Sequence, residues 1–182
     1  MTLADRVAAA VPVTGGIPRP VVTAPDAVLS RPGEPVDPAD GKTAALAADL
    51  LATMAAAPGC VGLAAPQLGQ GVRVFAVNVA GHPRAGASHG AFVLCNAELV
   101  QASRWRVGRE GCTSVPDLTG DVKRAGRVVV TGQLPGTGEP VTVTTEGFEA
   151  RALQHELDHC AGLLFLDRVA GAHAIHRRQV YL

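Results

Sequence analysis

The spacing of proline limits where this chain can form long helices. Seven prolines fall within the first 38 residues, where they favour extended or turn structure. Between residues 40 and 57, proline is absent and apolar residues recur at helical spacing, as Leu46, Leu50 and Met54 show. Residues 146–163 also lack proline and have glycine only near their ends. The chain is therefore expected to contain two long helices, one over each of these stretches.

Short β-rich segments separate the two predicted helices. Gly, Pro and Asn lie between these segments, as in turns that join antiparallel strands. The order helix, several strands, helix predicts an α+β fold, a compact single domain with antiparallel β-sheets around the second helix. We expect residues 26–182 to form this domain and residues 1–25 to be an N-terminal extension with little order. The expected strands are residues 72–79, 92–100, 105–107, 128–132 and 140–145.

The composition excludes several classes of function. Lys and Arg total 16, as do Asp and Glu, and aromatics are only 3%, which argues against a nucleic-acid partner. No run approaches the roughly 18 apolar residues of a membrane span, and the apolar residues 7–11 are too few for a secretory signal. We therefore expect a cytoplasmic protein without membrane contact. Its cysteines should then be reduced, as buried apolar side chains or as ligands.

The most informative residues lie in the second predicted helix. His155 and His159 are four residues apart, so both imidazoles project from one face of the helix. Phe148 and Ala152 share this face, which is otherwise apolar. Two imidazoles on a core face are best explained by a shared cation, because buried polar groups need partners. Glu156 lies beside them and can act on water at that cation.

A catalytic metal needs a third protein ligand and an open coordination position. Cys112 is the best candidate, because Gly111 before it allows a close backbone approach and Pro116 after it favours an extended segment. Cys160 points away from the two histidines and is expected in the core. Asp158 either orients a ligand or caps the surface, and the sequence leaves both roles open.

Three separated motifs resemble the signatures of the peptide deformylase family. They are Gly-Leu-Ala-Ala-Pro-Gln at residues 62–67, Glu-Gly-Cys-Thr-Ser at residues 110–114 and Gln-His-Glu-Leu-Asp-His at residues 154–159. They occur in the order found in the family. Residues 28–32 resemble the family's N-terminal strand, and residues 162–168 resemble the segment after its metal helix. The resemblance covers residues from about 28 to 168.

This resemblance implies an enzyme that hydrolyses the formyl group from the N-terminal formyl-methionine of new polypeptides and releases formate. Its metal ligands would be Cys112, His155 and His159, and its general base Glu156. The cofactor would be one divalent ion, Fe²⁺ in the cell, with Zn²⁺, Ni²⁺ or Co²⁺ able to occupy the same site. The partners would be formyl-methionyl nascent peptides at the ribosome.

The resemblance also implies a way to bind the substrate. Gln67 and the backbone N–H of Thr113 would stabilise the negative charge that develops on the formyl oxygen. The methionine side chain needs an apolar slot beside the metal. The candidates for its wall are Val61, Gly62, Phe148 and Ala152.

Three positions depart from the family pattern. Cys60 replaces a glycine, whereas Thr113 and Cys160 each replace a leucine. None of the three is a ligand or the base, so the reaction class is retained. Thr113 adjoins the site, and its smaller apolar surface would weaken transition-state binding by roughly ten-fold. Alternatively, its hydroxyl would serve a more polar substrate, or its side chain faces away from the substrate and the change is neutral.

Two other functions remain open at this point. One is a related hydrolase that acts on another formylated or acylated amine. The other is a catalytically idle metal-binding protein on the same scaffold. The presence of Glu156 and Gln67 argues against the idle protein, because a structural metal site needs neither and is closed by a fourth protein ligand.

Overall fold

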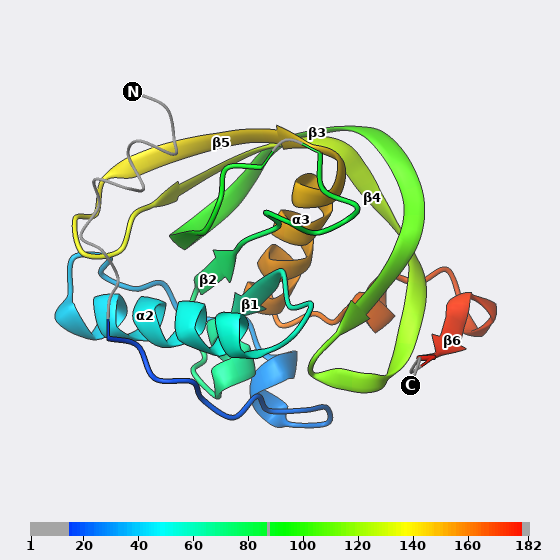
Figure 1. The fold of residues 1–182 in the computed structure, drawn as a ribbon, viewed down its shortest axis with the longest axis horizontal. Helices are drawn as coiled ribbons and strands as arrows, with labels where there is room; N and C mark the ends of the chain where they lie inside the picture. Colours follow the sequence, from blue (N-terminus) through cyan, green and yellow to red (C-terminus); the bar gives the residue numbers. More distant parts are fainter. Residues whose placement is uncertain (1–14, 87, 180–182) are drawn as a thin grey trace.

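Two α-helices, six strands and four short 3₁₀ helices make up the described part of the chain, which is residues 15–86 and 88–179 of a computed structural model (Figure 1). In chain order they are η1 (Ala27–Ser30), α2 (Gly41–Ala56), β1 (Gly62–Ala64), η2 (Ala65–Leu68), β2 (Val74–Val77), β3 (Phe92–Cys112), β4 (Val115–Gln133), β5 (Pro140–Glu146), α3 (Gly147–Cys160), η3 (Phe165–Arg168), η4 (Ala172–Ala174) and β6 (Ile175–Arg177).

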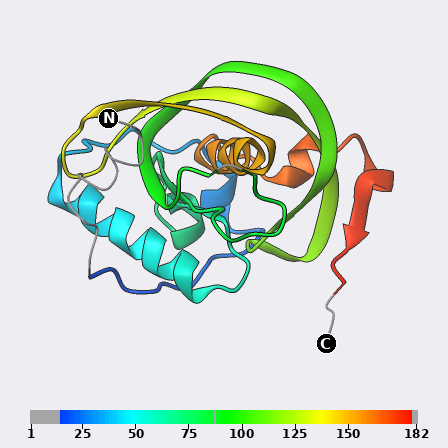
Figure 2. The same ribbon diagram turned by 45° about the horizontal axis from the view of Figure 1, so that its top comes forward.

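The strands form one antiparallel sheet in which neighbours along the chain pair. The order is β1-β2-β3-β4-β5, and β6 pairs with β4 away from this path. β3 and β4 form one long hairpin, which runs from Cys95 opposite Gln133 to Cys112 opposite Val115. Figure 2 looks nearly along α3 and shows this hairpin curving around the helix. The expected α+β architecture with a central helix is thus confirmed.

Local sequence explains where the two helices begin and end. The side chain of Asp40 accepts the N–H of Lys42 at 2.8 Å and caps α2, which ends just before Pro58-Gly59. α3 follows β5 directly because Gly147 takes a φ of 68°, which turns the chain sharply. Neither these helices nor any other in the described residues is long and apolar enough to cross a lipid bilayer.

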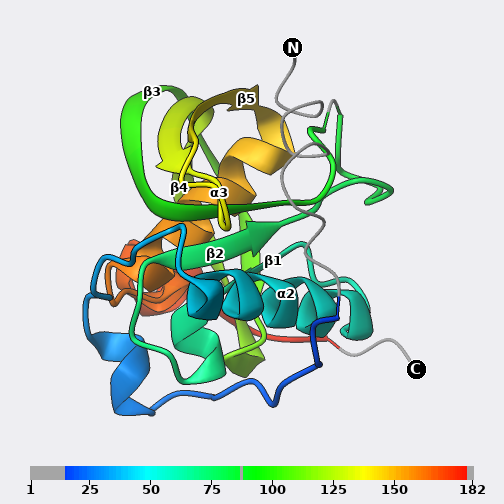
Figure 3. The same ribbon diagram turned by 90° about the vertical axis from the view of Figure 1, so that its left-hand side faces the viewer.

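Strands β1 and β2 lie between the two helices, so each helix covers one side of them (Figure 3). On the α3 side, Leu153 packs in one core cluster with Phe75 and Leu94. On the α2 side, Leu50 packs in a second cluster with Leu63. Burial of one such side chain contributes about 1.5–3 kcal/mol, so apolar packing holds α3 in the centre of the domain.

The strand predictions are correct in place but wrong in extent. Residues 92–100 and 105–107 belong to the single strand β3, and β4 begins at Val115 rather than near residue 128. Gly108 and Gly120 lie in these strands outside the predicted ranges. Each nevertheless keeps a partner in the β3–β4 ladder, so pairing across the hairpin outweighs their weak strand propensity.

Residues 28–30 were expected to form a strand and instead lie in η1. The side chain of Asp26 accepts the N–H of Val28 at 3.0 Å. This contact caps a tight turn, so the backbone here coils instead of extending.

The N-terminal extension expected over residues 1–25 falls partly on residues 1–14, which lie outside the described residues. By contrast, residues 15–25 are hydrogen bonded to the rest of the domain. The N–H of Val22 donates to the carbonyl of Gln67, and the N–H of Ala24 donates to that of Ser114, both at 2.9 Å. The domain boundary at residue 26 stays a prediction.

Truncation of the central helix's core side chain should destabilise the fold. Leu153 is fully buried, so Leu153→Ala should lower the free energy of unfolding by about 2–5 kcal/mol. Leu99→Ala is the matched control, because Leu99 is 44% exposed and should change stability little. Urea unfolding measures both. Equal losses in the two variants would contradict the central position of α3.

Candidate metal centre

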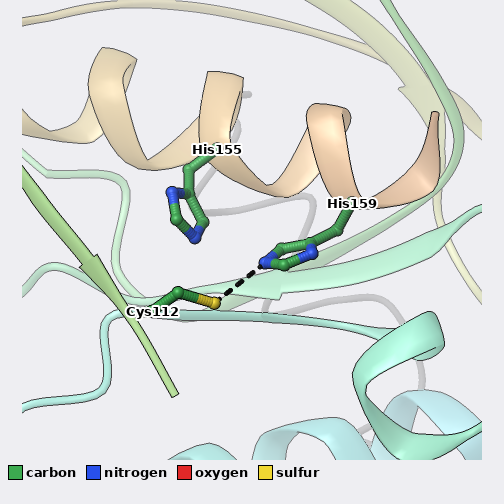
Figure 4. A group of neighbouring side chains, drawn as sticks. All are labelled: Cys112, His155 and His159. Carbon is green, nitrogen blue, oxygen red and sulfur yellow. Dashed lines mark hydrogen bonds between the residues drawn. The ribbon is translucent and has the colours of Figure 1, made fainter. Parts of the chain in front are cut away.

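Three side chains that can bind a metal converge between α3 and the end of β3. One ligand atom from each of Cys112, His155 and His159 lies within 4.8 Å of the other two. The Sγ of Cys112 is 3.3 Å from Nε2 of His159 (Figure 4). The expected i, i+4 geometry is therefore present, and the cysteine expected to join it does so. Among the described residues, this is the one group of three or more His, Cys, Asp or Glu side chains that could hold a metal ion.

The other cysteines do not belong to this group. Burial raises the pKa of the Cys60 thiol to about 11 and the pKa values of Cys95 and Cys160 to about 12. Their ligand atoms do not converge with those of the two histidines, as Sγ of Cys112 does. Cys160 is in the core, as expected.

His155 is oriented by a buried carboxylate. Its Nδ1 lies 3.1 Å from Oε2 of Glu110, so a proton on Nδ1 leaves Nε2 free to face the metal. Burial alone would raise the pKa of Glu110, but hydrogen bonds from His155 and Arg124 hold it well below its usual range. Glu110 therefore remains ionised while it holds the imidazole.

A network of buried charges fixes Glu110 and answers the question about Asp158. Arg124 binds both oxygens of Glu110 at 3.0 Å and also binds Asp158. Arg168 binds Asp158 at 2.6 Å, and Arg151 binds Glu110 at 2.7 Å. Asp158 thus hydrogen bonds to Arg124 and Arg168 rather than directly to a histidine of the group, and it is buried rather than at the surface. It joins α3 to β4 and η3.

Glu156 lies in the floor of the site with one oxygen unpartnered. Its side chain is buried, and Oε2 accepts no hydrogen bond from any described residue. Burial raises the pKa of Glu156 to about 7, so it can hold or release a proton at neutral pH. A Cβ at Gly62 would collide with this carboxyl group, so the absence of a side chain at Gly62 leaves room for Glu156.

His159 is buried as a neutral imidazole. Burial lowers the pKa of His159 well below its usual value. A neutral ring is the form that binds a metal. Its Nδ1 has no partner among the described residues, and its Nε2 faces Cys112.

The side chain of Gln67 spans from η2 to the turn after β3. Its Oε1 accepts the N–H of Ala64 at 2.9 Å, which directs Nε2 towards the turn. Nε2 lies 3.1 Å from Oγ1 of Thr113, 3.2 Å from Oγ of Ser114 and 3.5 Å from Sγ of Cys112. The hydroxyl of Thr113 therefore lies within hydrogen-bonding distance of the Gln67 amide.

A cavity of about 450 Å³ opens over these residues. Every residue predicted for the substrate slot lines it, as do Gln67, Thr113 and Glu156. Arginines also line it, which sequence reasoning did not foresee. The predicted slot residues in its wall are Val61, Gly62, Phe148 and Ala152.

Sequence reasoning missed the roles of Glu110, Arg124 and Arg151. Glu110 directly precedes Gly111-Cys112 in the second of the three motifs. A histidine ligand usually donates its second ring N–H to a carboxylate, so an acidic residue beside the cysteine ligand was an available signal. The arginines carry no such local signal, because their partners lie in other elements.

The residues present suit a divalent metal ion. One thiolate and two imidazoles are donors for a catalytic ion that keeps a position open to water. The carboxylate on His155 and the unpartnered oxygen of Glu156 agree with such an ion. The cavity gives it access to a substrate.

Comparisons with known proteins agree with this geometry. The family model described as polypeptide deformylase matches residues 18–174. A peptide deformylase from Halothermothrix orenii is 42% identical over 144 residues, which are 79% of this chain and 88% of that protein. The crystal structure of the Thermotoga maritima peptide deformylase has a TM-score of 0.76 at 31% identity and covers 85% of this chain and 99% of that one.

A second solved structure carries a bound peptide. It is the Met-Ala-Ser-bound class I type b peptide deformylase from Acinetobacter baumannii, which has a TM-score of 0.74 and 32% identity. The match covers 85% of this chain and all of that one.

Loss of any of the three side chains should abolish metal binding. Cys112→Ala, His155→Ala and His159→Ala should each retain less than about one-tenth of the parent's metal after dialysis. Cys160→Ala and His173→Ala are the matched controls, since neither side chain belongs to the group. Elemental analysis of the purified proteins measures the metal. Full occupancy in the Cys112 variant would exclude this cysteine as a ligand.

Proposed function

The chain belongs to the polypeptide deformylase family, and we propose that Cys112, His155 and His159 hold the metal of this enzyme. Its activity is that of a metal-dependent hydrolase which removes the formyl group of nascent peptides. Neither the related hydrolase for another acylated amine nor the idle metal-binding protein is favoured by the comparisons. The observation that carries the proposal is the Cys–His–His group at the base of an open cavity, with Cys112 and His159 buried and Glu156 beside them.

Glu156 is proposed as the general base. A divalent ion held by Cys112, His155 and His159 would supply Lewis acidity, which would make water a better nucleophile at neutral pH. The unpartnered Oε2 of Glu156 is free to take a proton from the attacking water. The same carboxyl group returns the proton to the amine as the C–N bond breaks, so formate and a free N-terminus are released.

Gln67 and the backbone N–H of Thr113 are proposed to stabilise the oxyanion. Charge develops on the formyl oxygen as water adds to the formyl carbon. The Nε2 of Gln67 already points to the turn that carries Cys112, so it can donate to an oxygen placed beside the metal ligands. Removal of one such donor typically costs about 10²–10³ in rate.

The methionine side chain is proposed to occupy the apolar part of the cavity. Val61, Phe148 and Ala152 supply apolar wall there, and Gly62 leaves the backbone of β1 accessible. The relative bound to Met-Ala-Ser supports a peptide that begins with methionine as the ligand of this cavity.

Ferrous iron is proposed as the ion in the cell, with Zn²⁺, Ni²⁺ or Co²⁺ able to replace it. A thiolate with two imidazoles suits each of these ions. Elemental analysis of protein purified without oxygen identifies the ion that is bound.

We also propose that the enzyme works in the cytoplasm, on chains that emerge from the ribosome. Ribosome sedimentation with the protein tests this association.

Removal of the proposed base should separate metal binding from turnover. Glu156→Gln should keep the metal but lower kcat on formyl-Met-Ala-Ser by at least about 10², because no group remains to take the proton. Glu98→Gln is the matched control, since the Glu98 side chain is 70% exposed and outside the cavity. Formate release and elemental analysis give the two readouts. Turnover within a few-fold of the parent would show that Glu156 is not the base.

Thr113 should matter through its hydroxyl. Thr113→Leu removes an acceptor that holds the Gln67 amide and should lower kcat by about three- to ten-fold. Thr113→Ser keeps the hydroxyl and should restore most of the rate. Steady-state kinetics on formyl-Met-Ala-Ser show whether the hydrogen bond to Gln67 or the apolar contact with the substrate matters more. A faster Thr113→Leu enzyme would instead mean that the lost apolar contact dominates.

A further inference from the structure

Arginines gather at the mouth of the catalytic cavity. Arg84 and Arg151, together with Phe148, line both this cavity and a second one of about 370 Å³, so the two cavities are neighbours. The chain as a whole has no net charge, whereas six arginines and three glutamates line these two cavities. The arginines that line the two cavities are Arg84, Arg104, Arg106, Arg109, Arg151 and Arg178.

Half of these arginines already bind a carboxylate. Arg151 binds Glu110 at 2.7 Å, Arg109 binds Asp121 at 2.7 Å, and Arg104 binds Glu146 at 3.2 Å. The other half have no carboxylate within ion-pairing distance among the described residues. They are Arg84, Arg106 and Arg178.

Arg178 reaches the catalytic cavity from the segment after β6. Its Nη2 donates to the carbonyl of Cys112 at 3.2 Å. The absence of a side chain at Gly111 makes room for it, because a Cβ there would collide with this guanidinium. Arg178 is half-buried, so its charge faces the cavity with limited screening by water.

Arg84 lies against the slot proposed for methionine. Its guanidinium carbon is 4.7 Å from the centre of the Phe148 ring, and Nη1 is 3.5 Å from the carbonyl of Arg109. These contacts orient the side chain but satisfy few of its five N–H groups. Its remaining N–H groups are available to the part of a bound peptide that extends beyond the methionine slot.

We propose that Arg84 and Arg178 select formyl-methionyl peptides that carry Asp or Glu in the two residues after the methionine. This rests on the proposed function, because the peptide must first place its methionine in the catalytic cavity. Residues that follow then pass the unpaired guanidinium groups at its mouth. Guanidinium and carboxylate groups form paired hydrogen bonds with matching geometry. The two cavities can also accept the side chains of an extended peptide, whereas the surface of a nucleic acid is too flat to fill them.

Three peptides that differ only in side-chain charge test the proposal. They are formyl-Met-Glu-Glu, formyl-Met-Gln-Gln and formyl-Met-Lys-Lys, each with an amidated C-terminus so that no terminal carboxylate contributes. With the metal-loaded parent at low salt, kcat/KM for the Glu peptide should exceed that for the Gln peptide by roughly three- to ten-fold. The Lys peptide should be slowest, and the difference should shrink at high salt.

Arg84→Gln and Arg178→Gln should each reduce the Glu-to-Gln ratio, and the double variant should bring it close to one. Arg31→Gln is the matched control, because Arg31 is exposed and lines neither cavity. It should keep both the parent's ratio and its rate. The ratio is insensitive to any general loss of activity, so a damaged site does not imitate the expected result.

The outcomes separate this proposal from the function itself. Equal kcat/KM for the Glu and Gln peptides, with both hydrolysed, would overturn the selection for acidic residues and leave the deformylase function intact. If none of the three peptides were hydrolysed, the proposed deformylase function would be overturned. Salt-sensitive binding of a single-stranded RNA probe that Arg84→Gln abolishes, without a peptide preference, would assign the arginines to nucleic acid and overturn the proposal.

Discussion

The carboxylate of Glu110 is the contact on which the geometry of the site depends. It binds Arg124 of β4 at 3.0 Å, Arg151 of α3 at 2.7 Å and Nδ1 of His155 at 3.1 Å. One buried charge thereby joins both long strands to the helix that they enclose. A buried carboxylate that lost a partner would be costly, so these groups must be ordered together. The orientation of the metal-facing imidazole thus depends on the pairing of β3 with β4.

The site has a rigid side and an adaptable side. On the rigid side, buried ion pairs and core packing fix α3, and with it His155, His159 and Glu156. On the other side, the amide of Gln67 is shared among several acceptors at the turn after Cys112, which also hydrogen bonds to Val22 and Ala24. An amide with several acceptors can give one up to a substrate without leaving a buried donor unpaired.

Much of this could be read from the sequence, because it depends on local spacing. Proline positions and apolar periodicity predicted both helices, and the i, i+4 histidines predicted one face of the metal group. The length of β3 and β4 could not be predicted, since their glycine-containing parts are strands only through cross-strand pairing. The partners of Glu110 were equally hidden, because a buried ion pair has no signature until Arg124 and Arg151 come together. The turn at residues 27–30 was missed because a single Asp26 cap overrode the strand expectation.

The curved hairpin also has a consequence for how the chain folds. β3 and β4 are adjacent in sequence and can pair early, whereas α3, which fills their concave side, is synthesised after them. Until the helix docks, the inner face of the hairpin is exposed, and Glu110 has only Arg124 to neutralise it. A half-made chain is therefore most prone to aggregate during the interval before α3 arrives. Cys112 ends β3 whereas His155 and His159 lie on α3, so the three side chains come together only when the helix docks into the hairpin.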